Sequence, residues 1–269
     1  MKKGSIMMKF GMPTLMEFNG VEESARLCAE LGLNFVEICM SLPQYTLEAI
    51  DVERFRDIGK RYGVKFTVHL DENVNFCDFN KKIADACFDY IISSAQMADR
   101  LGCKLINMHF HRGEHFTMPN GKVDLFSVYR DRYISRIMEF RTYCEAALKD
   151  AGVKICIENC KGYTDFQRDA LNILLASPVF GLTYDIGHSH RADYVDESFI
   201  IENRNKLFHM HLHDADSKND HLALGTGEID KEKYLRLASE CGCTVVLETK
   251  TSVGLRESVN WVRNNTLNN

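Results

Sequence analysis

The sequence predicts an α/β protein in which eight strand–helix units close into a single (β/α)8 TIM barrel. Short apolar and β-branched runs alternate with longer amphipathic runs along the whole chain. Glycine follows five of the amphipathic runs, where a left-handed residue commonly ends a helix. The length of 269 residues suits one such barrel. We therefore expect residues 1–269 to form one domain. A doubly wound open sheet is the alternative, but it would rarely need eight such units.

The predicted strands share a short length and an apolar or β-branched composition. In order they are Met7–Met12, Asn34–Cys39, Val64–His69, Lys104–His109, Val153–Glu158, Val179–Asp185, Lys206–His211 and Cys243–Glu248. Each is followed by a predicted helix with apolar residues three and four positions apart. The helices are Val21–Leu31, Leu47–Tyr62, Asn80–Leu101, Phe126–Ala151, Asp165–Ala176, Asp196–Asn203, Asp230–Cys241 and Val253–Asn264. The glycines after helices are Gly32, Gly63, Gly102, Gly152 and Gly242.

The longest irregular stretches follow strands rather than helices, at residues 71–79, 111–125 and 213–227. In a barrel these loops lie on the face at the carboxyl ends of the strands, where active sites are built. We therefore expect the functional residues on that face.

Composition and charge count against several functional classes, although a local basic patch stays open. The formal net charge of −5 provides no basic field for nucleic acid or an anionic membrane. No apolar run is long enough to span a membrane, and the N-terminus lacks the features of a signal peptide. The ten cysteines form no CxxC pair, so they are interpreted as reduced, core-filling thiols of a cytoplasmic protein. Neither a glycine-rich dinucleotide fingerprint nor a P-loop is present.

The stretch from Leu182 to His190 begins apolar, as a buried strand does, and continues into Asp185 and His188. A buried carboxylate is costly unless it is paired or bound to a cation, and Asp with His is a common ligand set for a divalent metal. The alternative is a capped turn, in which Asp185 accepts backbone N–H groups and His188 lies on the surface. Both interpretations stay open on this stretch alone.

Imidazoles and carboxylates end six successive predicted strands. They are His69, His109, Glu158, Asp185, His211 and Glu248. A single one of these is more often a hydrogen-bonded or solvated residue. However, carboxylates gathered on one rim repel one another unless a cation lies among them. The pattern therefore predicts a metal site, although His69 and His109 could instead bind a substrate hydroxyl.

Three histidines alternate on the predicted seventh strand, so His209, His211 and His213 point to the same face, the barrel interior. Only one of them needs to be a ligand. We expect His211 to lie at the depth of Asp185 and Glu158, His209 to pack deeper, and His213 to support loop structure.

Five fragments at successive strand ends carry a resemblance to a known superfamily. They are Ile157-Glu158-Asn159, Tyr184-Asp185-Ile186-Gly187-His188, His211-Leu212-His213-Asp214, the run from His221 to Asp230, and Leu247-Glu248-Thr249. With these fragments the chain resembles the xylose isomerase-like TIM barrels. That superfamily includes ketose 3-epimerases, inosose dehydratases, hydroxypyruvate isomerases and zinc-dependent apurinic endonucleases.

The resemblance implies one divalent ion held by Glu158, Asp185, His211 and Glu248, with His188 contacting the substrate. In the endonuclease branch, further metals recruit the residues that match His69, His109, His188 and His221. Here the position two residues before His221, where that branch has an acidic residue, is occupied by Asn219. The third metal site therefore lacks its carboxylate unless Asp220 or Asp216 substitutes for it. The loop at residues 41–45 is short and has no arginine to insert into a duplex.

The resemblance therefore implies a metal-dependent isomerase or epimerase that acts on a small keto sugar, polyol or sugar phosphate through an enediolate. Glu158 and Glu248 would be its acid–base pair, with His188 orienting a substrate oxygen. The cofactor would be Zn, Mn or Co, with Mg as a further option. The expected partner is a small carbohydrate, and a homo-oligomer is compatible with the sequence.

Cationic residues just after predicted strands could hold a phosphate or carboxylate of the substrate, or could be solvated loop charges. They are Arg112, Lys161, Arg191 and Lys250. The alternatives to an isomerase are a dehydratase on the same metal scaffold, a zinc-dependent phosphodiester hydrolase of the apurinic endonuclease type, and a non-catalytic sugar- or metal-binding barrel. The identity of the sugar and of the metal stays open.

Overall fold

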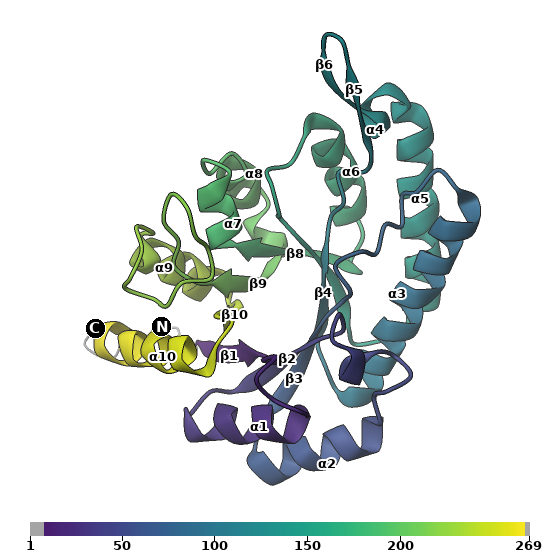
Figure 1. Ribbon diagram of the computed structural model, residues 1–269. Helices are drawn as coiled ribbons and strands as arrows, with labels where there is room; N and C mark the ends of the chain where they lie inside the picture. The colour runs from purple at the N-terminus through teal and green to yellow at the C-terminus, as the bar shows by residue number, and fades with distance from the viewer. Residues whose placement is uncertain (1–7, 267–269) are drawn as a thin grey trace, which may run out of the picture.

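The computed structural model describes residues 8–266 and shows eight parallel strands closed into a barrel with helices around it (Figure 1). Around the barrel the strands follow the order β1-β10-β9-β8-β7-β4-β3-β2, and β2 pairs with β1 to close it. This confirms the predicted (β/α)8 TIM barrel and excludes the open sheet. The barrel strands are β1 (Lys9–Pro13), β2 (Phe35–Cys39), β3 (Lys65–His69), β4 (Leu105–His109), β7 (Lys154–Glu158), β8 (Phe180–Asp185), β9 (Leu207–Leu212) and β10 (Thr244–Leu247).

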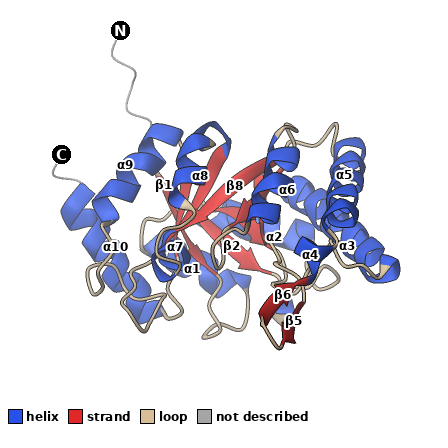
Figure 2. Ribbon diagram, turned by 90° about the horizontal axis from the view of Figure 1, so that it is seen from above, coloured by secondary structure: helices blue, strands red, loops and turns tan. Residues whose placement is uncertain are grey.

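The helices pack around the outside of the barrel, as the view from above shows (Figure 2). They are α1 (Val21–Glu30), α2 (Val52–Tyr62), α3 (Lys81–Leu101), α4 (Leu125–Val128), α5 (Arg130–Ala147), α6 (Asp165–Leu175), α7 (Ile186–Arg191), α8 (Glu197–Glu202), α9 (Lys231–Cys241) and α10 (Ser252–Thr266). All eight predicted strands are present, with ends within two residues of those expected. Met7, which the prediction included in the first strand, lies outside the described residues.

The apolar core lies between the strands and the helices. On β2, Val36 and Ile38 are fully buried in this layer, and Met210 and Leu212 occupy the same layer on β9. Because strand residues alternate between two faces, the residues between them point into the barrel. Polar side chains fill that interior, so the outer layer stabilises the fold while the inside is available for chemistry. The buried polar residues concerned include Glu37, Thr67, Asn107, Thr183, His209 and His211.

The second and fourth predicted helices differ most from the prediction. Helix α2 begins at Val52 rather than Leu47, because Asp51 caps it by accepting the Arg54 N–H at 3.1 Å. The residues before it form a short 3-10 turn, η1 (Pro43–Tyr45), and a further turn. The single helix predicted from Phe126 to Ala151 is two helices, since Tyr129 departs from helical geometry at φ −105° and ψ 45°. Helix α5 ends at Ala147, so Gly152 does not end a helix as predicted.

The stretch predicted to be irregular at residues 111–125 contains an antiparallel hairpin of β5 (His115–Met118) and β6 (Gly121–Asp124). It projects from the body of the barrel (Figure 1). The register pairs Phe116 with Val123, so these two side chains and Met118 share one face of the hairpin. All three are exposed to solvent. The sequence prediction missed this hairpin because its strands are only four residues long.

The cysteines are all free thiols, as predicted, and six of them are buried. Within residues 8–266, no helix is both long and apolar enough to cross a membrane.

We predict that Asp51→Ala destabilises the protein by about 1 kcal/mol, because the first turn of α2 loses its capping acceptor. The measurement is urea unfolding followed by circular dichroism. The control is Asp57→Ala on the same helix, where the carboxylate is exposed and lies 3.6 Å from Lys60. Its loss should stay below about 0.5 kcal/mol. Equal effects of the two substitutions would show that Asp51 does not set the start of α2.

Candidate metal centre

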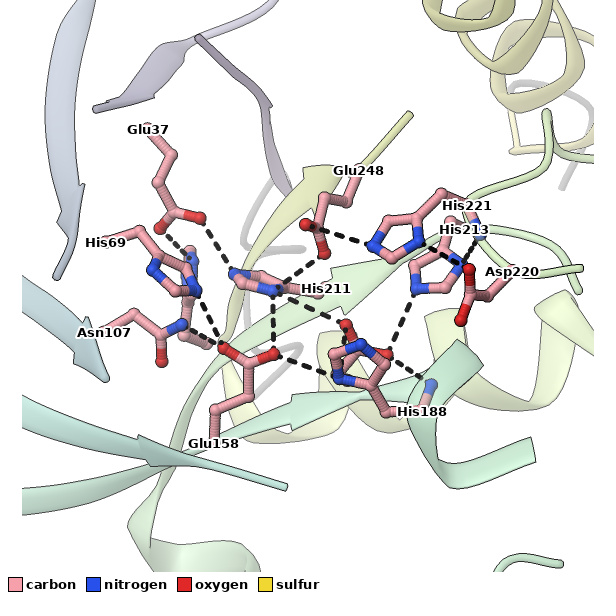
Figure 3. A network of polar contacts seen from close by, with 12 residues as sticks. Glu37, His69, Asn107, Glu158, His188, His211, His213, Asp220, His221 and Glu248 are labelled. Carbon is pink, nitrogen blue, oxygen red and sulfur yellow. Dashed lines mark hydrogen bonds and ion pairs between the residues drawn. The ribbon is translucent and has the colours of Figure 1, made fainter. Parts of the chain in front are cut away.

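The side chains of Glu158, His211 and Glu248 converge at the carboxyl ends of β7, β9 and β10 (Figure 3), and Asp185 joins them from the end of β8. Their common point is the Nδ1 atom of His211. Glu248 Oε2 lies 3.0 Å from this nitrogen, Glu158 Oε1 3.5 Å and Asp185 Oδ2 3.6 Å. The structure thus brings the four residues expected to be ligands to one position.

The four atoms that meet at this point share a second property. Glu158 Oε1, Asp185 Oδ2, Glu248 Oε2 and His211 Nδ1 are all buried and have no hydrogen-bond partner. Buried polar atoms normally find a partner, and each one left without costs about 1–3 kcal/mol. Three carboxylate oxygens and one imidazole nitrogen form a donor set suited to a divalent cation such as Zn²⁺ or Mn²⁺. The residues present therefore fit the expected metal.

The neighbouring histidines keep the carboxylates ionised. Burial alone would raise the pKa of Glu158 and of Glu248, but the His211 imidazole beside both holds the pKa of each well below its usual value. For the imidazoles of His69 and His188 burial has the opposite effect and lowers the pKa, but the nearby carboxylates of Glu158 and Asp185 raise it by more. The pKa of His69 rises to about 9 through Glu158, and that of His188 rises to about 10 through Asp185 and Glu158. Without a metal, His69 and His188 therefore carry protons at neutral pH.

Asp185 has both of the roles considered for it, because one oxygen caps a turn and the other faces the cluster. Its Oδ1 accepts the His188 N–H at 2.7 Å and so caps α7, a short helix that the sequence prediction missed. Its Oδ2 faces the cluster. The Asn159 side chain fixes this strand end, because it accepts the Asp185 N–H at 2.8 Å and donates to the Asp185 carbonyl at 2.9 Å.

His69, His109 and His188 surround Glu158. The Nε2 atom of His69 lies 3.3 Å from Glu158 Oε2, and that of His109 lies 3.7 Å from Oε1. His188 Nδ1 approaches Oε1 to 3.4 Å from the other side. Burial lowers the pKa of His109, which makes it the more readily neutral of these imidazoles. One donor atom each of His69, Glu158 and His211 lies within 4.8 Å of the others, so a second donor group adjoins the first and shares two residues with it.

His213 and His221 form a parallel stack, with ring centres 4.2 Å apart and planes at 5°. The His221 N–H donates to His213 Nδ1 at 2.8 Å, which holds His221 in a left-handed conformation at φ +56°. His221 Nε2 faces Glu248 Oε1 at 3.4 Å, and His213 Nε2 lies 3.2 Å from Asp185 Oδ1. A Cβ on Gly187 would come within 1.8 Å of the His213 ring, so only glycine fits there.

The acidic neighbour of His221 is Asp220, whose Oδ1 lies 3.0 Å from His221 Nδ1. Asn219 instead turns toward Asp216, whose carboxylate accepts from its backbone N–H at 2.7 Å and from its side chain. Asp220, rather than Asp216, is therefore the carboxylate in contact with His221.

The four candidate cationic contacts lie in different surroundings. Lys250 Nζ is 2.9 Å from Glu248 Oε1, at the edge of the cluster. Arg112 is paired with Asp124 at the base of the hairpin, with its Nη2 at 2.7 Å, and Lys161 is exposed. Arg191 donates to the Lys218 carbonyl and approaches Asp220 at 3.7 Å. Of the four, Lys250 is the one in contact with a proposed ligand.

Two buried residues of the site were not predicted from the sequence. Glu37 lies two positions before the end of β2, and its carboxylate contacts His209 and His211. Asn107 lies two positions before the end of β4 and donates to Glu158 Oε2. The prediction considered the last residue of each strand. The available signal was a charged residue inside the apolar run Phe35–Cys39.

The sequence matches the family described as "Xylose isomerase-like TIM barrel" over residues 25–265. A protein of Methanocaldococcus jannaschii, "Uncharacterized protein MJ1188", is 22% identical over 244 residues, which cover 88% of this chain and 86% of that protein.

Solved structures that resemble this chain include a D-tagatose 3-epimerase-like protein, with a TM-score of 0.76 and 22% identity over 97% of this chain and 100% of that one. The 3-keto-D-glucoside 4-epimerase YcjR of E. coli has a TM-score of 0.75 and 18% identity, covering 96% and 99% of the two chains. An IolI protein with a bound zinc atom has a TM-score of 0.70 and 16% identity, covering 96% and 97%. At these identities the likeness shows the fold.

We predict that the metal-free protein loses stability as the pH rises from about 6.5 to about 10. His69 and His188 bind protons more tightly in the folded chain, so their contribution is complete below the ordinary histidine pKa of 6.5. It disappears as the pH passes their raised pKa values of about 9 and about 10. Urea unfolding of EDTA-treated protein at several pH values should show a loss above about 1.4 kcal/mol, the equivalent of one pKa unit.

The matched variants for this measurement are His69→Gln and His115→Gln. His69→Gln should flatten the decline, because it removes one of the imidazoles whose pKa is raised in the folded chain. His115 is exposed on the hairpin, so His115→Gln should leave the decline unchanged. A metal-free wild type with constant stability across this range would contradict the assignment of protons to the cluster.

Proposed function

This chain belongs to the xylose isomerase-like TIM-barrel family, and we propose that it is a divalent-metal-dependent isomerase or epimerase of a small keto sugar, polyol or sugar phosphate. The observation that carries the proposal is the meeting of three unpartnered carboxylate oxygens at His211 Nδ1. The proposal is also supported by the names of similar structures, among them L-ribulose 3-epimerase and D-psicose 3-epimerase.

Glu158 and Glu248 lie on opposite sides of the His211 ring, which suits an acid–base pair (Figure 3). A divalent ion held by these two residues, Asp185 and His211 would supply a Lewis acid that makes the proton α to a carbonyl more acidic. Glu248 then accepts that proton from carbon at its carboxylate. Glu158, which is ionised at rest, relays a proton from the His188 imidazolium to the other face of the carbon. Glu248 then loses its proton to water and His188 regains one from water before the next turnover.

His188 is suited to keep Glu158 supplied with a proton. Its Nδ1 lies 3.4 Å from Glu158 Oε1, and its raised pKa means that the imidazole carries a proton at neutral pH. It is also partly exposed at the rim, where it can orient a substrate oxygen.

Lys250 is the best candidate among the cations for holding a substrate phosphate or carboxylate, because it extends from the edge of the cluster. Arg112 and Lys161 remain candidates for the distal end of a longer substrate. Arg112 would have to leave Asp124 for that role.

A phosphodiester hydrolase is the second candidate function. The approach of His69 and His109 to Glu158 favours it, because these residues could bind a further metal ion. Against it stand the net charge of −5 and the short, uncharged loop at residues 41–45. A dehydratase would use the same centre as the isomerase, since the enediolate can also expel a β-hydroxyl.

We predict that Glu248→Gln retains bound metal but loses proton exchange by about 10²–10⁴-fold. Gln keeps an oxygen ligand of similar shape and removes the proton acceptor. The measurement is deuterium incorporation from D₂O at the carbon α to the carbonyl, across a panel of ketoses and ketose phosphates. Glu228→Gln is the control, since Glu228 is an exposed rim carboxylate 4.0 Å from His190. Full exchange in Glu248→Gln would remove Glu248 from the acid–base pair.

We predict that His69→Ala has a mild effect on deuterium exchange, because one metal ion suffices for an isomerase. A multi-metal hydrolase would instead lose its activity with this change. Both activities should be measured on the same preparations, with abasic duplex DNA as the second substrate and His115→Ala as the control. A wild type that exchanges with no ketose, and nicks abasic DNA only while His69 is intact, would reverse the order of the two functions.

A further inference from the structure

We infer that Glu37 is a positioning residue of the metal centre, which holds the His211 ring with Nε2 turned away from the cluster and Nδ1 turned into it. The inference rests on the proposed function, because the role of His211 as a ligand belongs to that proposal. It assigns to Glu37 a part in building the centre without making it a ligand.

Glu37 is buried in the barrel interior, at 2% exposure, and both its oxygens face side-chain donors. Its Oε1 forms an ion-pair contact of 2.9 Å with His211 Nε2. Its Oε2 lies 3.0 Å from His209 Nε2 and accepts the Thr67 hydroxyl at 3.1 Å. His209 is held in turn by Thr244, whose Oγ1 lies 2.6 Å from its Nδ1. Figure 3 shows the contact between Glu37 and His211.

The contact determines which nitrogen of His211 can bind a cation. A neutral imidazole has one N–H and one lone pair, and the partner of one nitrogen decides where the proton stays. Carboxylate oxygens lie 2.9 Å from Nε2 and 3.0 Å from Nδ1, but one carboxylate meets Nε2 and three gather at Nδ1. When a cation occupies the three-carboxylate side, the proton stays at Nε2 beside Glu37 and the lone pair lies on Nδ1. That atom faces Glu158, Asp185 and Glu248. Metal-binding histidines commonly give their other N–H to a carboxylate in this way, which also makes the ligand more basic.

Glu37 reaches His211 across the barrel rather than along one strand. In the closed sheet β10 and β1 lie between β9 and β2, so the contact spans the interior. Since His209 on β9 and Thr67 on β3 restrain the same carboxylate, its position is fixed by barrel strands and not by a loop. The plane of the His211 ring is therefore determined before any ion binds.

Glu37, His209 and His211 could themselves be considered a cation site, because one donor atom of each lies within 4.8 Å of the others. The occupied carboxylate argues against this. Both Glu37 oxygens already lie within 3.1 Å of an imidazole or hydroxyl group. The unpartnered carboxylate oxygens lie on the other side of His211. The geometry points to a cation at Nδ1 and a supporting carboxylate at Nε2.

The test is Glu37→Gln in the full chain, with Zn²⁺ and Co²⁺ affinities measured by competition with a chelator. Gln has the shape of Glu, but its single acceptor oxygen cannot serve two imidazoles. We expect the affinity to fall about 10–100-fold, as for other residues that support metal-binding histidines. Glu37→Asp, which keeps the charge, should recover part of the loss.

Two spectroscopic readouts separate positioning from a general loss of structure. The visible absorption of the Co²⁺-loaded protein should change in Glu37→Gln, because the geometry at His211 changes. In the Zn²⁺-loaded wild type, ¹⁵N NMR of histidine should show His211 protonated at Nε2 and metal-bound at Nδ1.

The matched control is Asp196→Asn. Asp196 is also a fully buried carboxylate, but it accepts the Tyr163 N–H at 2.7 Å and lies outside the cluster. This variant should lose stability and keep its metal affinity.

The outcomes separate this inference from the proposed function. A wild type that binds Zn²⁺ or Co²⁺, together with a Glu37→Gln variant of equal affinity and unchanged spectrum, would overturn the role of Glu37 alone. A wild type that binds neither ion would overturn the metal-dependent function, and the role of Glu37 with it. A loss of affinity of the same size in Asp196→Asn would show a general effect of removing buried charge, which also overturns the positioning role.

Discussion

The structure of the site depends on one constraint, the burial of three carboxylates, with a fourth partly buried beside them, in the interior of a single barrel. Glu37, Glu158 and Asp185 are almost completely removed from water, and Glu248 lies close to them. A buried ionised carboxylate costs several kcal/mol unless other charges and hydrogen bonds compensate. Imidazoles provide that compensation on every side, which explains why so many of the ten histidines of the chain lie here. Four buried atoms of the cluster still lack a hydrogen-bond partner, and a bound cation would provide one for each of them.

The barrel can have a polar interior because a separate apolar layer, between the strands and the helices, stabilises the fold. Apolar strand residues pack outward against the helices, so the fold does not depend on an apolar barrel interior for its stability. Two glycines on the barrel strands leave room for aromatic rings of neighbouring strands. A Cβ on Gly11 would come within 2.4 Å of the Phe35 ring, and one on Gly181 within 2.4 Å of Phe208. Replacing either glycine would therefore displace an aromatic ring beside the polar interior.

The strands and the residues at their ends could be predicted from the sequence, because a buried parallel strand has a strong apolar signal and its last residue is easily identified. The alternation of the seventh barrel strand also predicted that His209 lies deeper than His211, but the deeper residues of other strands were missed. Glu37 and Asn107 lie one alternation deeper, and their roles depend on contacts between distant strands. The helix ends were missed for local reasons, since the cap at Asp51 and the break at Tyr129 outweigh the apolar periodicity around them.

The contact between Glu37 and His209 joins residues 172 positions apart in the sequence. During synthesis, the chain therefore carries an unneutralised glutamate in its second strand until the seventh barrel strand, β9, has left the ribosome. A partial barrel would leave this charge facing an unclosed interior, which disfavours compact intermediates made from the N-terminal half alone. The polar interior thus links the completion of the site to the closure of the barrel, and a truncated translation product would lack both.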